Sequence, residues 1–253
     1  MTTLAITFTP SKPRFFLGLR KILAVSLAVW ACAASSLESV STPAGPDGPA
    51  QITYIPAKTP APAVILLSGQ SGPANYQDYA AEVSGLGYYA VLIDGKDILT
   101  RTQDGNANLK KTIDRAQLSP HAAKGKSAVI AFSQGGGGAL AYATSMADTV
   151  SMVVMHYPAT SWMKEPGTLA KRFRMPVMIL TGERDRYNNN CCGVETMRAI
   201  EATAKEGTTP FELVVYPQAD HGFNLKSPAF RRDDAADAWR RTSDMLRQHH
   251  PIK

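Results

Sequence analysis

A serine set among small residues is the first candidate for chemistry in this sequence. Ser133 ends a short apolar run and is followed, after Gln134, by the four glycines 135–138. The pattern predicts a strand, a tight turn and a helix, and the turn needs little or no side chain two residues to either side of the serine. Ala131 and Gly135 meet this need, although alanine stands where a first glycine is usual. We therefore expect Ser133 to be a nucleophile, with the Gln134 N–H at a helix N-terminus, where an oxyanion is favoured.

A carboxylate and an imidazole further along the chain can complete this chemistry. Asp185 ends the segment Thr-Gly-Glu-Arg-Asp, and His221 lies in Ala-Asp-His-Gly-Phe. A serine hydroxyl is a weak nucleophile until a neutral imidazole takes its proton, and the imidazole needs a carboxylate to fix its tautomer and stabilise its charged form. Glu183 and Asp220 are alternatives for the carboxylate, and His156 is the alternative for the imidazole.

The sequence disfavours two other kinds of site. The glycines lack the G-x-x-x-x-G-K-[ST] motif, and Leu140 stands where the third glycine of G-x-G-x-x-G belongs, so we expect no nucleotide-binding loop. Cys191 and Cys192 are adjacent and have no second cluster of Cys or His at metal-ligand spacing, so we expect no zinc site. The cysteine pair can close a vicinal disulfide that braces a rigid loop behind Asp185. Alternatively, two thiols can lie in a polar loop where Asn190 caps the next helix.

The elements that position these residues alternate along the chain. Apolar runs of strand length cover Gln51–Ile55, 63–68, 89–94, Ser127–Phe132, Val150–His156, 176–181 and Phe211–Tyr216. Helical spacing of apolar residues covers 76–86, 106–117, 134–147, 195–205 and 229–247. Continuous apolar strands separated by helices predict an α/β fold with a mainly parallel central sheet and helices on both faces. Ser133, Asp185 and His221 all follow strands, and functional groups of such sheets collect at the carboxyl ends of the strands.

The first 33 residues predict a secretory signal peptide. Four basic residues precede the apolar stretch 22–30, and an A-x-A site follows, with cleavage expected after Ala33. The apolar stretch is shorter than the roughly 20 apolar residues that a membrane-spanning helix needs. A second interpretation is a lipoprotein cleavage box in which Cys32 is lipidated, and Trp30 fits that box poorly. We expect an exported protein, periplasmic or extracellular, without an integral membrane span once residues 1–33 are removed.

The remainder of the chain predicts one catalytic domain. Residues 34–50 are rich in Ser, Pro and Gly and predict a flexible lead-in, and residues 51–253 have the length of one α/β domain. The whole chain has 27 Lys and Arg, 21 Asp and Glu, and a formal net charge of +6. Residues 1–33 hold four of the basic residues and no acidic one, so the net charge falls to +2 without them. This small charge gives no reason to expect a nucleic-acid partner.

These motifs resemble the α/β-hydrolase family and, within it, the dienelactone hydrolase-like branch. The resemblance rests on Phe-Ser-Gln-Gly-Gly at Ser133, Thr-Gly-Glu-Arg-Asp at Asp185 and Asp-His-Gly-Phe at His221. The order of serine, acid and histidine is that of α/β-hydrolases, and the resemblance covers about residues 50–250. It implies a carboxylic-ester or lactone hydrolase that works through an acyl-enzyme, with a small-molecule ester as substrate and without a metal or organic cofactor.

The resemblance also implies an oxyanion hole formed by the backbone N–H groups of Gln70 and Gln134. The chain departs from the branch at Ser133, because dienelactone hydrolase itself uses a cysteine, so its particular substrate is not carried over. Ser68 stands where the branch often has a histidine. Residues 157–173, where many relatives carry a lid, form a short segment. We therefore expect an open or lightly covered pocket, suited to small or exposed acyl esters.

Two other functions fit the same residues. The same triad can transfer the acyl group to an alcohol or a sugar instead of water, which would make the protein an acyltransferase. A non-catalytic binding protein on a hydrolase scaffold is the alternative outside enzymes, because a fold does not determine a function. The sequence indicates no particular oligomeric state.

Overall fold

The computed structural model describes residues 38–253 of the chain. The predicted signal peptide, its cleavage after Ala33 and the lipidation of Cys32 lie outside the described residues and stay predictions. The described residues belong to one compact unit, Ser35–Lys253. Within residues 38–253, no helix combines the length and the apolar character needed to cross a membrane.

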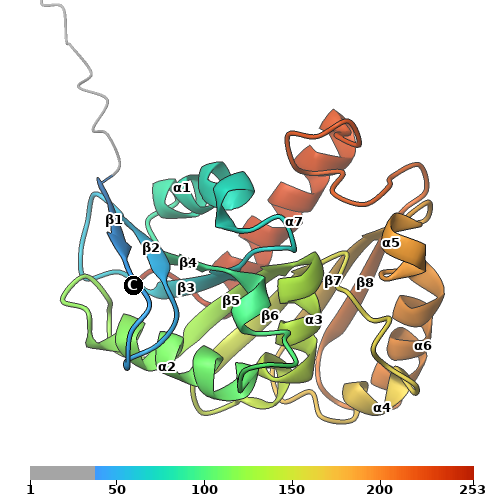
Figure 1. The fold of residues 1–253 in the computed structure, drawn as a ribbon, viewed down its shortest axis with the longest axis horizontal. Helices are drawn as coiled ribbons and strands as arrows, with labels where there is room; N and C mark the ends of the chain where they lie inside the picture. Colours follow the sequence, from blue (N-terminus) through green and yellow to red (C-terminus); the bar gives the residue numbers. More distant parts are fainter. Residues whose placement is uncertain (1–37) are drawn as a thin grey trace, which may run out of the picture. The chain divides into compact units, whose positions relative to one another are not determined.

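Eight strands of the described chain form one sheet (Figure 1). They are β1 (Glu38–Thr42), β2 (Gln51–Ile55), β3 (Ala63–Leu67), β4 (Tyr89–Ile93), β5 (Ser127–Phe132), β6 (Val150–His156), β7 (Val177–Gly182) and β8 (Phe211–Tyr216). The order across the sheet is β1-β2-β4-β3-β5-β6-β7-β8. β2 runs antiparallel to both β1 and β4, and every other neighbouring pair is parallel. The carboxyl ends of β3 to β8 therefore lie at the same end of the sheet.

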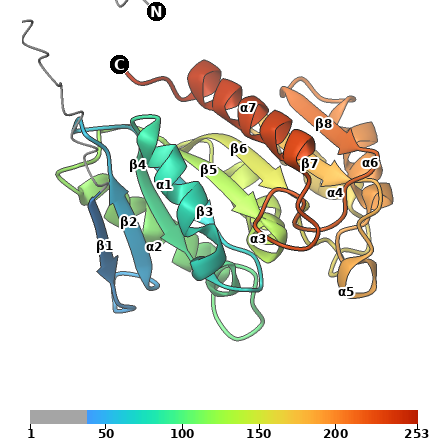
Figure 2. The ribbon, with the colours of Figure 1, turned by 90° about the horizontal axis from the view of Figure 1, so that it is seen from above.

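Helices cover both faces of this sheet. α1 (Gln77–Gly85) and α7 (Arg232–His249) cross one face, which is nearer the viewer in Figure 2. The other face carries α2 (Gly105–Leu118), α3 (Ser133–Ala141), α4 (Gly167–Ala170) and α6 (Val194–Ala204). α5 (Tyr187–Asn190) is a single turn in the loop after β7. Short 3-10 helices lie in the connections: η1 (Pro73–Tyr76), η2 (Gly95–Asp97) and η3 (Ala143–Ser145).

The core lies on both faces because the central strands are apolar throughout. Side chains of one strand alternate between the faces. In β3, Ile65 and Leu67 therefore pack on the same side as Ile113 of α2, whereas Val64 and Leu66 pack on the side of α1 and α7. Every residue of β3, β4 and β5 is buried. Each large apolar side chain buried in this way contributes roughly 1.5–3 kcal/mol, which holds the strand ends in place.

The observed architecture confirms the expected α/β fold class, and each of the seven predicted strands lies within one residue of its expected bounds. Two predictions differ from the structure. Residues 34–50, expected as a flexible lead-in, include β1, whose backbone pairs with β2 and whose Val and Thr residues suit a strand. The helix expected over 134–147 ends at Ala141. Just beyond it, the hydroxyls of Thr144 and Ser145 bond to backbone carbonyls and favour a tighter turn.

Candidate active site

Ser133 lies at the junction of β5 and α3, at the carboxyl end of a central strand. Its φ is 49°, in the left-handed region that a residue with a Cβ rarely adopts. The helix can begin this close to the sheet because Gly135 has no side chain, and a Cβ there would clash with the Ser68 carbonyl oxygen. The Gly135 N–H instead donates to this carbonyl at 3.0 Å. The turn leaves Ser133 only 5% exposed.

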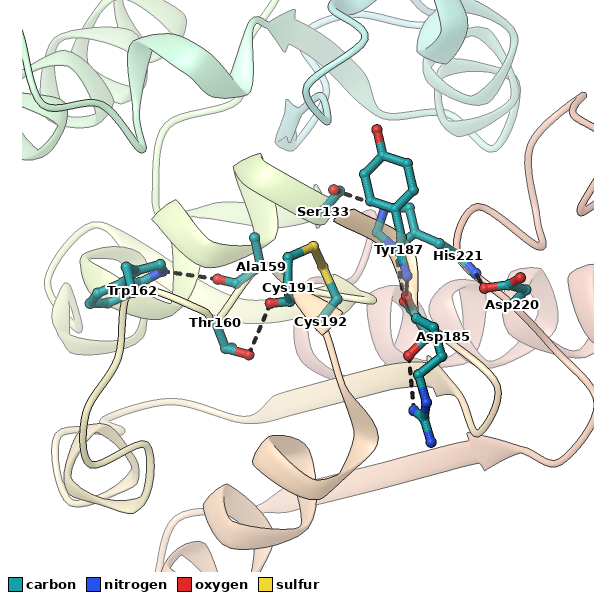
Figure 3. Close-up of a disulfide and its surroundings, with 11 residues drawn as sticks. Ser133, Ala159, Thr160, Trp162, Asp185, Tyr187, Cys191, Cys192, Asp220 and His221 are labelled. Atoms are coloured by element: carbon teal, nitrogen blue, oxygen red, sulfur yellow. Dashed lines mark hydrogen bonds and ion pairs between the residues drawn. A yellow bond between two sulfur atoms is a disulfide. The ribbon is translucent and has the colours of Figure 1, made fainter. Parts of the chain in front are cut away.

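The structure brings Ser133, Asp185 and His221 together (Figure 3). The Ser133 Oγ is 3.0 Å from His221 Nε2, and His221 Nδ1 is 2.8 Å from Asp185 Oδ2. Asp185 comes from the loop after β7, and His221 comes from the loop after β8. The Asp185 side chain is fully buried and that of His221 is 12% exposed. A neutral imidazole placed in this way can accept a proton at Nε2 while its Nδ1–H donates to the carboxylate.

The alternative residues make other contacts. Glu183 forms an ion pair with Arg198 at 2.6 Å. The Asp220 carboxylate accepts the backbone N–H of His221 at 2.7 Å, so it contacts the main chain and not the ring. His156 is fully buried in the core. The geometry therefore pairs the His221 ring with Asp185.

The segments that carry Gln70 and Gln134 both pass beside the serine. Gln134 is the second residue of α3, so its N–H has no acceptor within the helix. Gln70 is exposed and follows the end of β3. Its neighbour Gly69 approaches the serine closely, because a Cβ on Gly69 would lie 3.1 Å from the Ser133 Cβ. The loop after β3 and the first turn of α3 therefore lie next to each other beside Ser133.

Ser68 supports the segment that carries Gln70. Its Oγ accepts the Gly95 N–H at 3.1 Å and lies 3.4 Å from Asp94 Oδ1, which links the loop after β3 to the loop after β4. Its carbonyl accepts the Gly135 N–H. The serine at this position therefore joins three segments that surround the candidate nucleophile.

A disulfide bond joins Cys191 and Cys192 in the loop after β7 (Figure 3). The Cys191 carbonyl accepts the N–H groups of Thr160 and Ser161, at 2.7 and 3.0 Å. Thr160 and Ser161 belong to the loop after β6. These bonds connect the loop that carries the candidate acid to its neighbour across the sheet end.

The backbone between the acid and the disulfide takes an unusual path. Asn188, Asn189 and Asn190 have φ values of 43°, 57° and 63°, in the left-handed region that asparagine tolerates better than most residues. The alternative in which Asn190 caps the following helix is wrong. The N-cap of α6 is Gly193, and no side-chain hydrogen bond caps it.

One group of side chains combines three metal-ligand types. A carboxylate oxygen of Asp185, the Cys192 sulfur and a ring nitrogen of His221 lie within 4.8 Å of one another. Zinc accepts all three ligand types. However, the Cys192 sulfur forms a disulfide with Cys191, and the His221 Nδ1 is hydrogen-bonded to the Asp185 carboxylate. The arrangement is therefore that of an acid–histidine pair beside a disulfide, and it does not fit an open metal site.

Two tyrosines that the sequence analysis missed contact the His221 ring. Tyr187 stacks on it with a centroid distance of 4.3 Å and an interplanar angle of 8°. Tyr157 packs against it at 4.6 Å and 60°. Each had a signal in the sequence, because Tyr157 follows the end of a predicted strand and Tyr187 lies two residues after Asp185.

A buried polar network lies behind these rings and centres on His156. Its Nδ1 is 3.0 Å from the Asn224 amide nitrogen, and its Nε2 is 3.4 Å from the hydroxyls of both Tyr79 and Thr242. Burial lowers the pKa of His156 to about 3, so the ring is neutral at pH 7. The Tyr157 hydroxyl donates to the Asn224 carbonyl oxygen at 2.8 Å. The network thus connects the core to the loop that carries His221.

A cavity of about 600 Å³ lies beside α3 at Gln134, the residue that follows Ser133. Its lining consists of Lys96, Leu99, Thr100, Arg101, Gln134, Ala141, Tyr142 and Trp162. This volume is typical of small-molecule sites. Residues 157–173, expected to cover the pocket only lightly, contribute Trp162 to its wall and contain no helix longer than the four residues of α4.

Comparison with known families and sequences gives consistent matches. Residues 50–250 match the model of the "Dienelactone hydrolase family". A Yersinia pestis protein provisionally named carboxymethylenebutenolidase is 27% identical over 215 residues, which cover 75% of this chain and 79% of that protein. Alignments with proteins of the same name from Methylorubrum extorquens and Escherichia coli span 87 residues each, and cover only 28% and 31% of the length of those proteins.

Solved structures share the same architecture. A Klebsiella pneumoniae protein provisionally named a dienelactone hydrolase has a TM-score of 0.71 at 20% identity, over 84% of this chain and 99% of that one. Esterase 2 of Thermogutta terrifontis, phosphoramylated by tabun, has a TM-score of 0.66 at 20% identity, over 85% and 96% of the two chains. At these identities the similarity shows the fold alone.

Proposed function

The chain belongs to the dienelactone hydrolase family, and we propose that it hydrolyses carboxylic esters or lactones through an acyl-enzyme. Ser133 is the proposed nucleophile, His221 is the general base and acid, and Asp185 orients His221. One observation supports this proposal more strongly than any other. A continuous chain of hydrogen bonds runs from Ser133 through both ring nitrogens of His221 to the Asp185 carboxylate, with distances of 3.0 and 2.8 Å.

The proposed reaction has two halves. As the Ser133 Oγ attacks the acyl carbonyl carbon, its proton moves to His221 Nε2. The imidazolium then gives this proton to the leaving alkoxide oxygen, and the acyl group remains on the serine. Water attacks the acyl-enzyme by the same route, and the proton that His221 takes from water returns to the Ser133 Oγ. The buried Asp185 carboxylate stabilises the imidazolium in both halves.

The oxyanion of each tetrahedral intermediate needs hydrogen-bond donors. We assign this role to the backbone N–H groups of Gln70 and Gln134. The position of Gln134 in the first turn of α3 supports the assignment, because the positive end of the helix dipole favours an anion there. The close approach of Gly69 to Ser133 supports the part of Gln70. Each such donor is worth about 3 kcal/mol of the barrier.

The proposed substrates are small esters or lactones. The cavity of about 600 Å³ reaches the site at Gln134 and is not lined by Ser133, Asp185 or His221. Its walls are aromatic and aliphatic with two basic side chains, Lys96 and Arg101, and would take an acyl or alcohol group of modest size. The names of the relatives agree with this class, since one refers to a butenolide, which is a lactone, and another to an esterase.

The test compares the protein with Ser133→Ala on p-nitrophenyl esters from acetyl to palmitoyl. We expect turnover of the shorter esters, and a loss in kcat/KM of at least about a thousandfold in Ser133→Ala because the nucleophile is absent. Ser39→Ala, in the exposed strand β1, is the matched control and keeps wild-type kcat/KM. A fluorophosphonate should label the wild type and Ser39→Ala but not Ser133→Ala.

Two results would redirect the proposal. Transfer of the acyl group to added alcohols or sugars, in preference to hydrolysis, would favour an acyltransferase that uses the same residues. A folded wild-type protein that shows neither turnover nor labelling would contradict an enzyme and favour a binding protein on this scaffold.

A further inference from the structure

Tyr187 presents the face of its ring to His221 (Figure 3). The ring centroids are 4.3 Å apart and the ring planes differ by 8°. Tyr187 is also 45% exposed, so it lies between the imidazole and solvent. A flat ring in parallel contact shields one face of the imidazole from water.

The loop after β7 holds this ring in place. The Tyr187 N–H donates to Asp185 Oδ1 at 3.1 Å, while Asp185 Oδ2 is 2.8 Å from His221 Nδ1. One carboxylate therefore fixes both the imidazole and the backbone of the residue stacked on it. The left-handed residues 188–190 and the anchored carbonyl of Cys191 support the turn that follows. The stacked position thus results from the path of the loop.

We infer that Tyr187 is a positioning residue whose ring holds the His221 imidazole and stabilises the imidazolium formed when Ser133 loses its proton. The inference rests on the proposed function. The face of an aromatic ring attracts a cation placed over it. Exclusion of water also lowers the local dielectric and strengthens the hydrogen bond between His221 and Asp185.

Tyr157 contacts the same imidazole in a different way. Its ring is inclined by 60° and is 1% exposed, and its hydroxyl is bonded to Asn224. Tyr157 is therefore part of the core, and truncating it would leave a cavity. Tyr187 can be replaced without opening the core, so its variants separate a role in catalysis from a role in folding.

The kinetic test uses Tyr187→Phe, which keeps the ring, and Tyr187→Leu, which keeps only apolar bulk. With p-nitrophenyl acetate we expect Tyr187→Phe to stay within about twofold of wild type, and Tyr187→Leu to lose about tenfold in kcat with little change in KM. Phe230→Leu is the matched control, because Phe230 is an aromatic residue of similar exposure, 49%, outside the contacts of His221. The inference is overturned if Tyr187→Leu keeps its kcat, if Tyr187→Phe is equally slow, or if the loss falls on KM.

A spectroscopic test does not depend on turnover. The ring current of a stacked tyrosine shifts the NMR signals of the His221 ring C–H protons upfield. We expect this shift in the wild type and in Tyr187→Phe, and its loss in Tyr187→Leu. Equal signals in all three proteins would overturn the stacking. If the shift is present but the wild type shows neither turnover nor labelling, the proposed hydrolysis fails, and the catalytic role of Tyr187 fails with it.

Discussion

At the scale of single residues, the lack of a side chain at Gly135 allows the tight turn that holds Ser133 at the end of β5. The Ser133 backbone has a φ of 49°, and α3 begins immediately beside β3. This approach is possible because Gly135 has no side chain, since a Cβ there would clash with the Ser68 carbonyl oxygen. The Gly135 N–H donates a hydrogen bond to the same carbonyl. The same Cβ would also lie 2.7 Å from the Leu67 Cβ. A methyl group at position 135 would therefore have to push the helix away from the sheet.

Gly135→Ala tests this close approach. The clash involves backbone atoms, which rotation of a side chain cannot relieve, so we expect the free energy of unfolding to fall by about 1–3 kcal/mol. We also expect kcat/KM to fall at least about tenfold, because Ser133 moves relative to His221. Urea unfolding and ester hydrolysis measure the two effects. Gly85→Ala is the control, since a Cβ there meets nothing within 4 Å, and it should stabilise α1 by up to about 1 kcal/mol. Wild-type stability and activity in Gly135→Ala would contradict this account.

At the scale of elements, the loop after β7 carries most of what surrounds the imidazole. Asp185 is hydrogen-bonded to the His221 ring, and Tyr187 stacks on that ring. The sulfur of Cys192, which forms a disulfide with Cys191, lies within 4.8 Å of the ligand atoms of Asp185 and His221. The Cys191 carbonyl fastens the loop to the segment after β6. This loop is therefore an ordered part of the candidate site. Catalytic residues often lie on loops that a rigid sheet holds in position.

Replacing both cysteines should loosen this loop more than it destabilises the protein. The double variant Cys191→Ala/Cys192→Ala removes a bridge between neighbouring residues, and the chain-entropy model assigns so short a closure only about 1 kcal/mol. We expect a loss in kcat/KM of about tenfold, because the Asp185 and Tyr187 positions become less defined. Dithiothreitol should slow the wild type and leave the double variant unchanged. Alkylation of two thiols in the native, unreduced wild type would show that the bridge is absent.

At the scale of the whole molecule, His156 connects the two helices that cover one face of the sheet to the candidate site. It lies at the end of β6, contacts Tyr79 of α1 and Thr242 of α7, and stacks on Phe132 with a centroid distance of 4.7 Å. Its Nδ1 is 3.0 Å from Asn224 in the loop that follows His221. The folded protein therefore holds a neutral imidazole in a packed core, and protonating it requires that the core open.

This buried imidazole predicts acid sensitivity. Burial lowers the pKa of His156 from 6.5 to about 3, so between these values the unfolded chain binds a proton that the folded chain does not. Stability should then fall as the pH decreases below about 6.5, by about 1.4 kcal/mol per pH unit for this group. His156→Gln cannot titrate, so the slope of its unfolding free energy between pH 6 and pH 4 should be smaller by that amount. His250, whose pKa burial lowers to about 4, leaves part of the slope in the variant. Equal slopes in urea unfolding of the two proteins would contradict this role of His156.

The sequence by itself determined the class of fold and the candidates for chemistry. The strands were predictable because continuous apolar runs bury on both faces of a parallel sheet, as Ile65 and Val64 do in β3. The turn at Ser133 was predictable because its requirements lie within two residues, at Ala131 and Gly135. Such patterns act over a few residues, so they can be recognised without knowledge of the rest of the chain.

Only the tertiary structure decided which groups meet. Glu183, Asp185 and Asp220 were all available as carboxylates, and the packing of two loops is what directs Asp185 to the ring of His221. The stacking of Tyr187 on His221 also joins two loops that α6 and β8 separate in the sequence. The path of a loop results from every surface against which it packs, and the strand and helix patterns of the sequence do not contain that information.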